Sequence, residues 1–298
     1  MKGSRYFYRI SAPVSSFFAL LSAALFACNA LCVRLAVRSS TPATAALVSI
    51  ATNFATLWLT AILSGSLSQL ALGPALVFLL AGAFTPGLAR LSYYEAITLI
   101  GITPASTITS STPIFAAILA VPVLGERLSL RVALGTLLVV AGVWLSIRSP
   151  GTSSGPRSWA GVLLALNTAL MAAISFILRK VGLRMLPDPL LASTITVTGS
   201  LAVLLPFLAL QRRITPIRMD RSSLPWLIAG GLLTTGGFLS YFQALNLGEV
   251  VRVTPLSNTT PIFTVLLLRC FRKVETVGLA ASLGAFLAVA GVVFVVTD

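Results

Sequence analysis

Histidine is absent from the 298-residue sequence, and acidic side chains are scarce, with seven Asp and Glu in total. Histidine and carboxylates are the side chains that most often serve as general bases and as metal ligands. Their shortage argues against a membrane-embedded enzyme and against a bound metal. We therefore expect no catalytic residues, no metal site and no cofactor.

Cysteine is also rare. Cys28, Cys32 and Cys270 lie in apolar stretches. Cys28 and Cys32 are four residues apart, which places them on one helix face, where an intact turn seldom has the geometry of a disulfide. We interpret all three as small packing residues.

Charged residues make up only 9% of the chain, whereas hydrophobic residues make up 57%. About a quarter of an ordinary soluble domain is charged, so this composition indicates a membrane protein. The formal net charge of +14 comes from Lys and Arg scattered between apolar runs, without a continuous basic face. We therefore expect contact with the headgroups of a lipid bilayer and no nucleic-acid partner.

Long apolar windows predict ten transmembrane helices, because about twenty apolar residues cross the hydrocarbon layer. The predicted fold class is therefore an all-α polytopic membrane protein. The windows lie near residues 15–37, 44–64, 75–97, 103–123, 128–147, 159–181, 190–210, 224–246, 250–271 and 276–296.

An internal repeat relates the two halves of the chain. Residues 91–115 align with residues 239–263 at a constant offset, and nine of the 25 positions are identical. Each half then holds five helices, and because five is odd, the two copies must enter the membrane in opposite orientations. We predict a first repeat at 1–148, a polar linker at 149–158 and a second repeat at 159–298, related as two inverted five-helix repeats.

The stretch from Leu91 to Ile147 resembles the EamA-type repeat of the drug/metabolite transporter superfamily. The resemblance rests on an aromatic pair before Ala96, a small polar run that ends at Pro113, the turn at 124–127 with sequence LGER, and a helix with Gly135 and Gly142. It implies ten helices, a cavity formed by both halves, both termini in the cytoplasm and a place in the cell membrane, inner or plasma. Lys and Arg are divided too evenly between the two sides to set the orientation independently.

Polar runs inside the apolar windows point to a solute pathway, because polar groups are costly in a bilayer unless they pair or line water. Two runs are repeat partners, and each ends in a proline, which we expect to kink its helix. The alternative is that the small hydroxyls serve close helix packing. The predicted substrate-binding residues in these runs are Thr109, Ser110, Thr112 and Pro113 in the first half and Ser257, Asn258, Thr260 and Pro261 in the second.

Two tyrosines at equivalent repeat positions, Tyr93 and Tyr241, are further substrate-binding candidates. Their rings could clamp an apolar group, or they could belong to an interfacial aromatic belt. The neighbouring Glu95 is the acid best placed for proton coupling, although it could instead snorkel or pair with Arg90.

The first and sixth helices add Asn29 and Asn167, which interrupt apolar runs, as substrate-binding candidates. Arg34 and Arg179 align between the same helices. Either they hold a carboxylate or, the interpretation that we favour, they snorkel to the membrane edge.

Other marked positions have structural interpretations. Glu126 and Glu275 lie at helix-connecting turns and are expected to cap helices or anchor turns. Glycines of the fifth and tenth helices are expected to form close-packing faces. The last helix mediates dimerisation in small four-helix relatives, so we expect a monomer or a homodimer.

The favoured function is secondary transport by alternating access, with export of neutral or aromatic amino acids or similar small metabolites. The chain has no phosphate-binding P-loop, so transport is passive or driven by a gradient. The alternative is efflux of drugs or organic cations by proton antiport. A channel or a non-transporting scaffold explains the inverted duplication less well.

Overall fold

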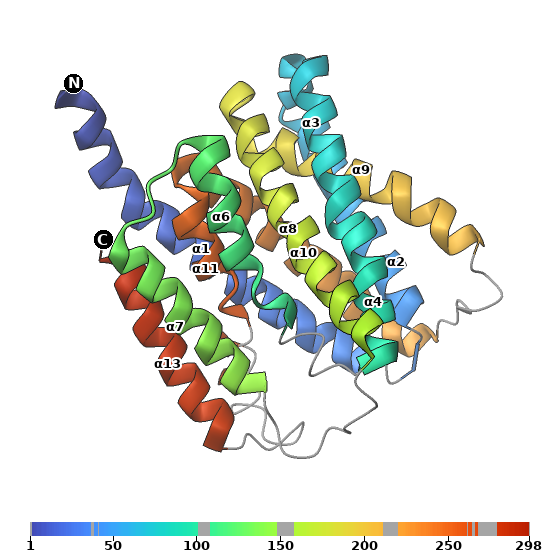
Figure 1. The fold of residues 1–298 in the computed structure, drawn as a ribbon. Helices are drawn as coiled ribbons and strands as arrows, with labels where there is room; N and C mark the ends of the chain where they lie inside the picture. The colour runs from blue at the N-terminus through green and yellow to red at the C-terminus, as the bar shows by residue number, and fades with distance from the viewer. Residues whose placement is uncertain are drawn as a thin grey trace.

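The computed structural model describes residues 2–36, 39–40, 42–100, 108–147, 158–210, 220–260, 262–263, 266–267 and 279–297. Within these ranges every element longer than a single bridge residue is a helix (Figure 1). The helices are α1 (Lys2–Ala36), α2 (Pro42–Leu63), η1 (Ser66–Gln69), α3 (Leu72–Gly82), η2 (Ala83–Leu88), α4 (Ala89–Ile100), α6 (Thr112–Leu124), α7 (Leu130–Ile147), α8 (Trp159–Met185), α9 (Pro189–Leu210), η3 (Arg221–Ser223), α10 (Leu224–Leu247), α11 (Val250–Ser257) and α13 (Leu279–Val296).

Each of the ten predicted windows coincides with a helix in the described part of the chain, which confirms the fold class. Three described helices are by themselves long and apolar enough to cross a bilayer: Pro13–Val33, Trp159–Met185 and Pro189–Phe207. Shorter apolar helices lie at Leu47–Leu63, Leu72–Leu88, Thr112–Leu124, Leu130–Leu145 and Phe286–Val296. The predicted linker at 149–158 lies, apart from Ser158, outside the described residues, so the domain boundaries stay a prediction.

Large apolar side chains cover the outside of the helix bundle. Examples are Phe17, Leu130 and Phe286, which are 61%, 76% and 75% exposed. Such a surface is unstable in water but suits contact with lipid chains, which are as apolar as these side chains. The composition and the surface therefore agree on a membrane-embedded protein.

The third span is broken in its middle by a proline. Pro86 lies in η2, and Thr85 before it has non-helical backbone angles, φ −142° and ψ 125°. A proline clashes with an α-helical residue before it and removes one backbone donor, so the helix is interrupted at this point. As a result, the carbonyl of Thr85 is free to accept a hydrogen bond from outside its own helix.

The prolines of the fourth and ninth spans were expected to kink their helices. The structure instead places Pro113 in the first turn of α6, where its missing N–H has no partner to lose. Gly125, with φ +68°, ends α6 in the left-handed conformation that favours glycine. Pro261 lies outside the described residues.

The helices pair in a pattern that respects the repeat. Three contacts each have an equivalent under the repeat. The contact of α1 with α10 corresponds to that of α8 with α4, and the contact of α3 with α9 corresponds to that of α10 with α2. The contact of α6 with α8 corresponds to that of α11 with α1. In two further contacts, α7 with α13 and α6 with α11, the two partners are repeat equivalents of each other. Because each of these contacts joins one half to the other, the described parts of the two repeats form a single interlocked bundle with pseudo-twofold symmetry.

The predicted glycine faces pack against each other within the chain. α7 and α13 lie side by side along one edge of the bundle (Figure 1). A Cβ atom at Gly142 would lie 2.5 Å from the Gly284 carbonyl oxygen, and one at Gly291 would lie 2.6 Å from the Gly135 carbonyl oxygen. Only glycine permits this approach of the two backbones.

Candidate functional site

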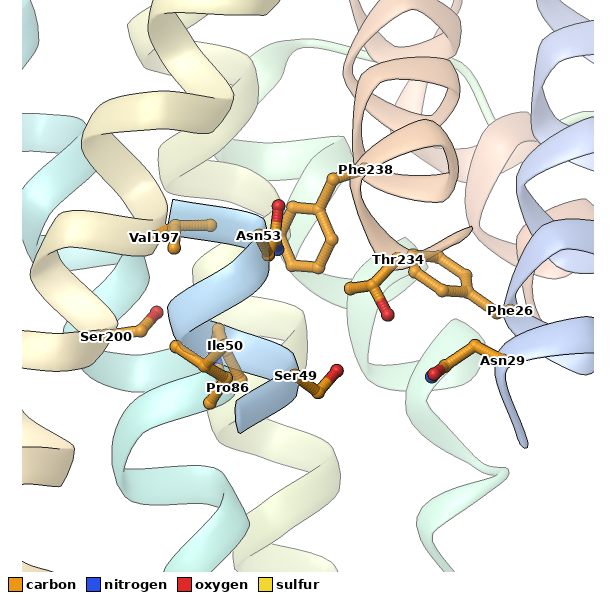
Figure 2. Close-up of a pocket in the computed structure, with 10 residues that line it drawn as sticks. All are labelled: Phe26, Asn29, Ser49, Ile50, Asn53, Pro86, Val197, Ser200, Thr234 and Phe238. Atoms are coloured by element: carbon orange, nitrogen blue, oxygen red, sulfur yellow. The ribbon is translucent and has the colours of Figure 1, made fainter. Parts of the chain in front are cut away.

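A cavity of about 130 Å³ lies between the two repeats. Its walls come from α1, α2 and η2 of the first half and from α9 and α10 of the second (Figure 2). The lining residues are Phe26, Asn29, Ser49, Ile50, Asn53, Pro86, Val197, Ser200, Thr234 and Phe238. The lining mixes apolar and polar side chains in equal number. A pocket of this kind at the contact of two repeats is a common position for a small-molecule site.

Most polar groups of the cavity bond within the protein. Asn53 Oδ1 accepts a hydrogen bond from Thr235 Oγ1 at 3.0 Å, and Ser200 Oγ donates to the Gly82 carbonyl at 3.1 Å. Thr234 Oγ1 donates to the Gly230 carbonyl, one turn back in its own helix. Asn29 is the exception, because its Oδ1 is buried and has no hydrogen-bond partner among the described residues. The cavity therefore offers one free acceptor.

Phe238 lines the cavity and also contacts a buried arginine. Its ring meets Phe26 edge to face at 5.8 Å and stacks on Phe242 at 6.3 Å. Cζ of Arg179 in α8 is 5.6 Å from the centre of the Phe238 ring.

Arg179 is only 3% exposed and sits inside the bundle, so the favoured prediction that it snorkels to the membrane edge is wrong. Its Nη2 donates to the Thr85 carbonyl at 2.6 Å, the group freed by the break at Pro86. Four aromatic rings surround its guanidinium, with centres 5.4 to 5.7 Å from Cζ: those of Phe176, Phe238, Tyr241 and Phe242. We call these four rings and Arg179 the arginine cage. Cation–π attraction compensates part of the cost of burying the charge.

Three polar atoms of this region have no hydrogen-bond partner of normal geometry among the described residues: Arg179 Nε, the Tyr241 hydroxyl and Thr85 Oγ1. Buried polar atoms in folded proteins are nearly always paired, so each exception calls for an explanation. Tyr241 was predicted from the sequence as a substrate-binding residue, and the structure places it in the arginine cage rather than on the cavity wall.

A second polar cluster joins the repeats at one end of the bundle. Glu126, between α6 and α7, accepts hydrogen bonds from the backbone N–H groups of Val250 and Val251 at 2.9 and 3.0 Å. It therefore caps the first turn of α11 in the other half, and its predicted role as a cap is confirmed. Burial raises the pKa of the Glu126 carboxyl above its ordinary value.

Two basic residues of α8 cap the C-terminal ends of neighbouring helices at the same end of the bundle. Lys180 Nζ donates to the Gly248 carbonyl at 2.6 Å, just beyond α10, and Arg184 Nη2 donates to the Leu124 carbonyl at 2.9 Å, at the end of α6. Positive groups at helix C-termini complement the helix dipole. We call Glu126, Lys180 and Arg184 the capping cluster.

The other predicted site residues lie away from the cavity. Thr112 Oγ1 donates to the Thr109 carbonyl at 2.7 Å at the start of α6, where Ser110 and Pro113 also lie. In α11 and the turn after it, Asn258 Nδ2 bonds to the Thr254 carbonyl and Thr260 Oγ1 to the Ser257 carbonyl. α6 and α11 pack against each other, so the structure brings the two helices of the polar runs together, but none of these residues lines the cavity.

Three candidates on α4 and α8 are spread over a different contact. Tyr93 is half-buried and packs near Ala96 and Ala165, and Asn167 Nδ2 donates to Ser92 Oγ at 3.2 Å. Glu95 is exposed on the surface of the bundle. The roles assigned to these residues stay predictions, and the Arg34 side chain lies outside what the structure describes.

Sequence reasoning found Asn29 but missed most of the cavity. Asn53 and Ser200 interrupt apolar windows and carried a usable signal, because polar residues in a span point to a pathway. Phe238 carried none, since one more aromatic residue in an apolar window looks like packing. Among the described residues no group of three or more His, Cys, Asp or Glu could hold a metal ion.

Comparison with known proteins supports the same architecture. A solved structure described only as the crystal structure of a protein aligns with a TM-score of 0.79 over 94% of this chain and 95% of its own length. At 17% identity it shows the fold alone. No curated protein sequence matches the chain. The profile of the EamA-like transporter family matches residues 14–148 and 159–297, which include every cavity residue. The chain belongs to the EamA-like transporter family.

Proposed function

We propose that the protein is a secondary transporter that works by alternating access and exports amino acids, neutral or aromatic, or similar small metabolites. The observation that carries this proposal is the cavity between the two repeats, lined by residues of both. In such an architecture, exchange of conformations between the repeats exposes the same cavity to each side of the membrane in turn. Membership of a transporter family supports the same function.

The size of the cavity favours small solutes over drugs. Its volume of about 130 Å³ is close to that of an engineered cavity that takes up benzene, about 150 Å³. Pockets for drug-sized ligands measure about 300 to 1,000 Å³. In this conformation the site suits the side chain of one amino acid.

The charge near the cavity argues against organic cations, the substrates of the alternative function. No carboxylate is among the residues that line the cavity, and the nearest buried charge behind Phe238 is the positive guanidinium of Arg179. A cation would be repelled at this position, because charges interact strongly in a low-dielectric interior.

We also propose the placement that goes with this function: the cell membrane, with both termini in the cytoplasm. The chain then acts as a monomer, since the glycine faces of α7 and α13 already cover each other.

Counterflow in proteoliposomes tests the proposal. Vesicles loaded with unlabelled L-leucine or L-phenylalanine should accumulate the labelled form from outside, whereas vesicles loaded with tetraphenylphosphonium should not accumulate labelled tetraphenylphosphonium. The reverse result would establish the cation alternative, and exchange of neither solute class would overturn the transport proposal. An imposed pH gradient with Glu95→Gln then tests proton coupling, with Asp220→Asn in the exposed segment before η3 as the matched control.

A further inference from the structure

The guanidinium of Arg179 holds a positive charge inside the bundle with little to balance it. Among the described carboxylates none pairs with it; its hydrogen bond to the Thr85 carbonyl and its cation–π contacts are the interactions that the structure shows. A buried charge normally has an ionic partner, because removing it from water costs several kcal/mol. The next residue, Lys180, adds a second positive charge and directs it to the end of α10.

The elements packed around Arg179 supply a carbonyl acceptor, a hydroxyl and aromatic rings, but no described acid. η2 contributes Thr85, and α10 contributes Phe238, Tyr241 and Phe242. Arg179 and the Tyr241 hydroxyl lie beside each other, and among the described residues neither Arg179 Nε–H nor this hydroxyl has a hydrogen-bond partner of normal geometry. Two unused donors beside an unbalanced positive charge match an anion that accepts two hydrogen bonds.

Two residues of the cavity wall are tied to this position. Phe238 lines the cavity on one side and contacts the guanidinium on the other. Pro86 lines the cavity too and directly follows Thr85, which holds Arg179 Nη2. Rotation of the Phe238 side chain would therefore connect the cavity to the arginine cage.

Resting on the proposed function, we propose that Arg179 is the residue that recognises the substrate, by binding its carboxylate through Nε–H with help from the Tyr241 hydroxyl. Phe238 separates this subsite from the cavity until the substrate arrives. Oδ1 of Asn29, on the cavity wall, has no partner among the described residues and accepts a hydrogen bond from the α-amino group of the same substrate. The site then selects α-amino acids, and the free acceptor and the free donors of the region each gain a partner.

Matched acid and amide probes test the carboxylate contact. Binding to the purified full-length protein in detergent is measured by thermal shift for L-leucine, L-phenylalanine and benzoate, each against its amide. A charge-assisted hydrogen bond contributes enough to make each acid that binds about tenfold or more tighter than its amide. Acids and amides of equal affinity in the wild type, or the absence of any acid-induced shift, would overturn the inference.

Variants separate recognition from a merely structural role. Arg179→Gln should weaken the acids by about tenfold or more and leave the amides within about twofold, so that the preference is lost. Arg184→Gln removes another arginine of α8 that also donates to a helix end, and should keep the wild-type preference. A structural role of Arg179 predicts equal weakening of acid and amide, which would overturn the proposal. Should Arg179→Gln not fold, Arg179→Lys keeps the charge without the Nε donor and should weaken the acids alone.

Counterflow distinguishes the failure of this inference from the failure of the proposed function. Exchange of amides as fast as acids would leave a transporter without a carboxylate subsite. Tight, Arg179-dependent binding of acids without exchange of any solute would support the carboxylate subsite and overturn the proposed transport function.

Discussion

Buried hydroxyls of this protein mostly donate to a carbonyl of their own helix. Thr194 bonds to the Leu190 carbonyl and Thr196 to the Ala192 carbonyl, both at 2.7 Å. A hydroxyl that is satisfied in this way is compatible with an apolar interior and has no capacity left for a ligand. Against this background, Oδ1 of Asn29 and the buried donors of the arginine cage are exceptions, as are the hydroxyls of Thr254 and Ser257 in α11.

Asn29→Leu should separate stability from transport. A buried acceptor without a partner costs about 1 to 3 kcal/mol, and leucine has nearly the same shape without the polar atoms. We therefore expect a melting temperature equal to or above that of the wild type, together with a loss of at least about tenfold in amino-acid counterflow. Both quantities are measured on the same purified preparation.

Asn53→Leu is the matched control on the same cavity wall. Asn53 Oδ1 accepts from Thr235, so its loss removes an existing hydrogen bond and should lower the melting temperature. If Asn29→Leu destabilised the protein as much as Asn53→Leu, the amide of Asn29 would be structural and its role in the cavity would be refuted.

Residue types in the sequence singled out some residues of the candidate site. The directions of their side chains depend on burial and were not predictable from residue type. Asn29 and Tyr241 stood out in the sequence because polar atoms in a span need a reason. Arg179 stood out as well, but its position near the C-terminal end of α8 made snorkelling the natural expectation. Its inward direction depends on the rings of α10 and the broken backbone at Thr85, which lie far away in sequence.

At the scale of the elements, the caps of α11 show how one repeat holds the other. α11 has eight residues, and a helix this short depends on partners for its terminal N–H groups. Glu126 supplies two acceptors from the other half of the chain. The repeat position and the turn predicted a cap for Glu126, but only the structure shows which helix it caps.

The pH dependence of stability should identify Glu126. Because burial raises the pKa of its carboxyl, the folded protein holds this proton more tightly than the unfolded chain does. Glu126 therefore contributes stability that is fully present below its ordinary pKa and is lost as the pH rises through the raised value. The melting temperature of the wild type minus that of Glu126→Gln should accordingly fall as the pH rises from the ordinary pKa of glutamate, about 4.3, through the raised value.

The variant Asp220→Asn is a control for which the effect on stability should change with pH in the opposite direction. A hydrogen bond from Ser222 Oγ, at 2.7 Å, lowers the pKa of the Asp220 carboxyl. The stability that Asp220 contributes is present above its ordinary pKa and is lost as the pH falls. The melting temperature of the wild type minus that of Asp220→Asn should therefore rise with pH. A Glu126 difference that also rose with pH would contradict the assigned direction.

The helices themselves were predictable, because continuous apolar length determines a transmembrane span. The breaks within these helices were harder to predict from the sequence. The window at 75–97 looked uniform, yet Pro86 divides it into α3 and α4 and frees the carbonyl that holds Arg179. Conversely, Pro113 was expected to kink a helix and begins one instead, because what a proline does depends on where the helix starts.

At the scale of the whole molecule, the two halves pack against each other, so alternating access requires contacts between them to break and form. At the end of the bundle that holds the capping cluster, Ser15 of α1 also donates to the Ala244 carbonyl of α10 at 3.0 Å. If the two repeats exchange conformations, contacts of this kind at one end must separate while equivalent ones form at the other. The internal repeat predicted this symmetry from sequence, but not which end is closed.

A disulfide across α1 and α10 should therefore stop transport. A Cβ atom at Gly248 would lie 2.9 Å from Ser15 Cβ, and a disulfide needs about 3.8 Å, so a small separation lets Ser15→Cys bond to Gly248→Cys. The native cysteines Cys28, Cys32 and Cys270 are first replaced by serine. Oxidation should then abolish amino-acid counterflow, and a reducing agent should restore it.

The single variants Ser15→Cys and Gly248→Cys, treated with the same oxidant, should keep their own rates, because neither can close the bond within one chain. Gel mobility before and after reduction reports how much protein is cross-linked. Full counterflow in completely cross-linked protein would mean that α1 and the end of α10 stay together throughout the cycle. The moving contacts would then have to be sought elsewhere between the repeats, first where Glu126 holds α11, since that contact also joins one half to the other.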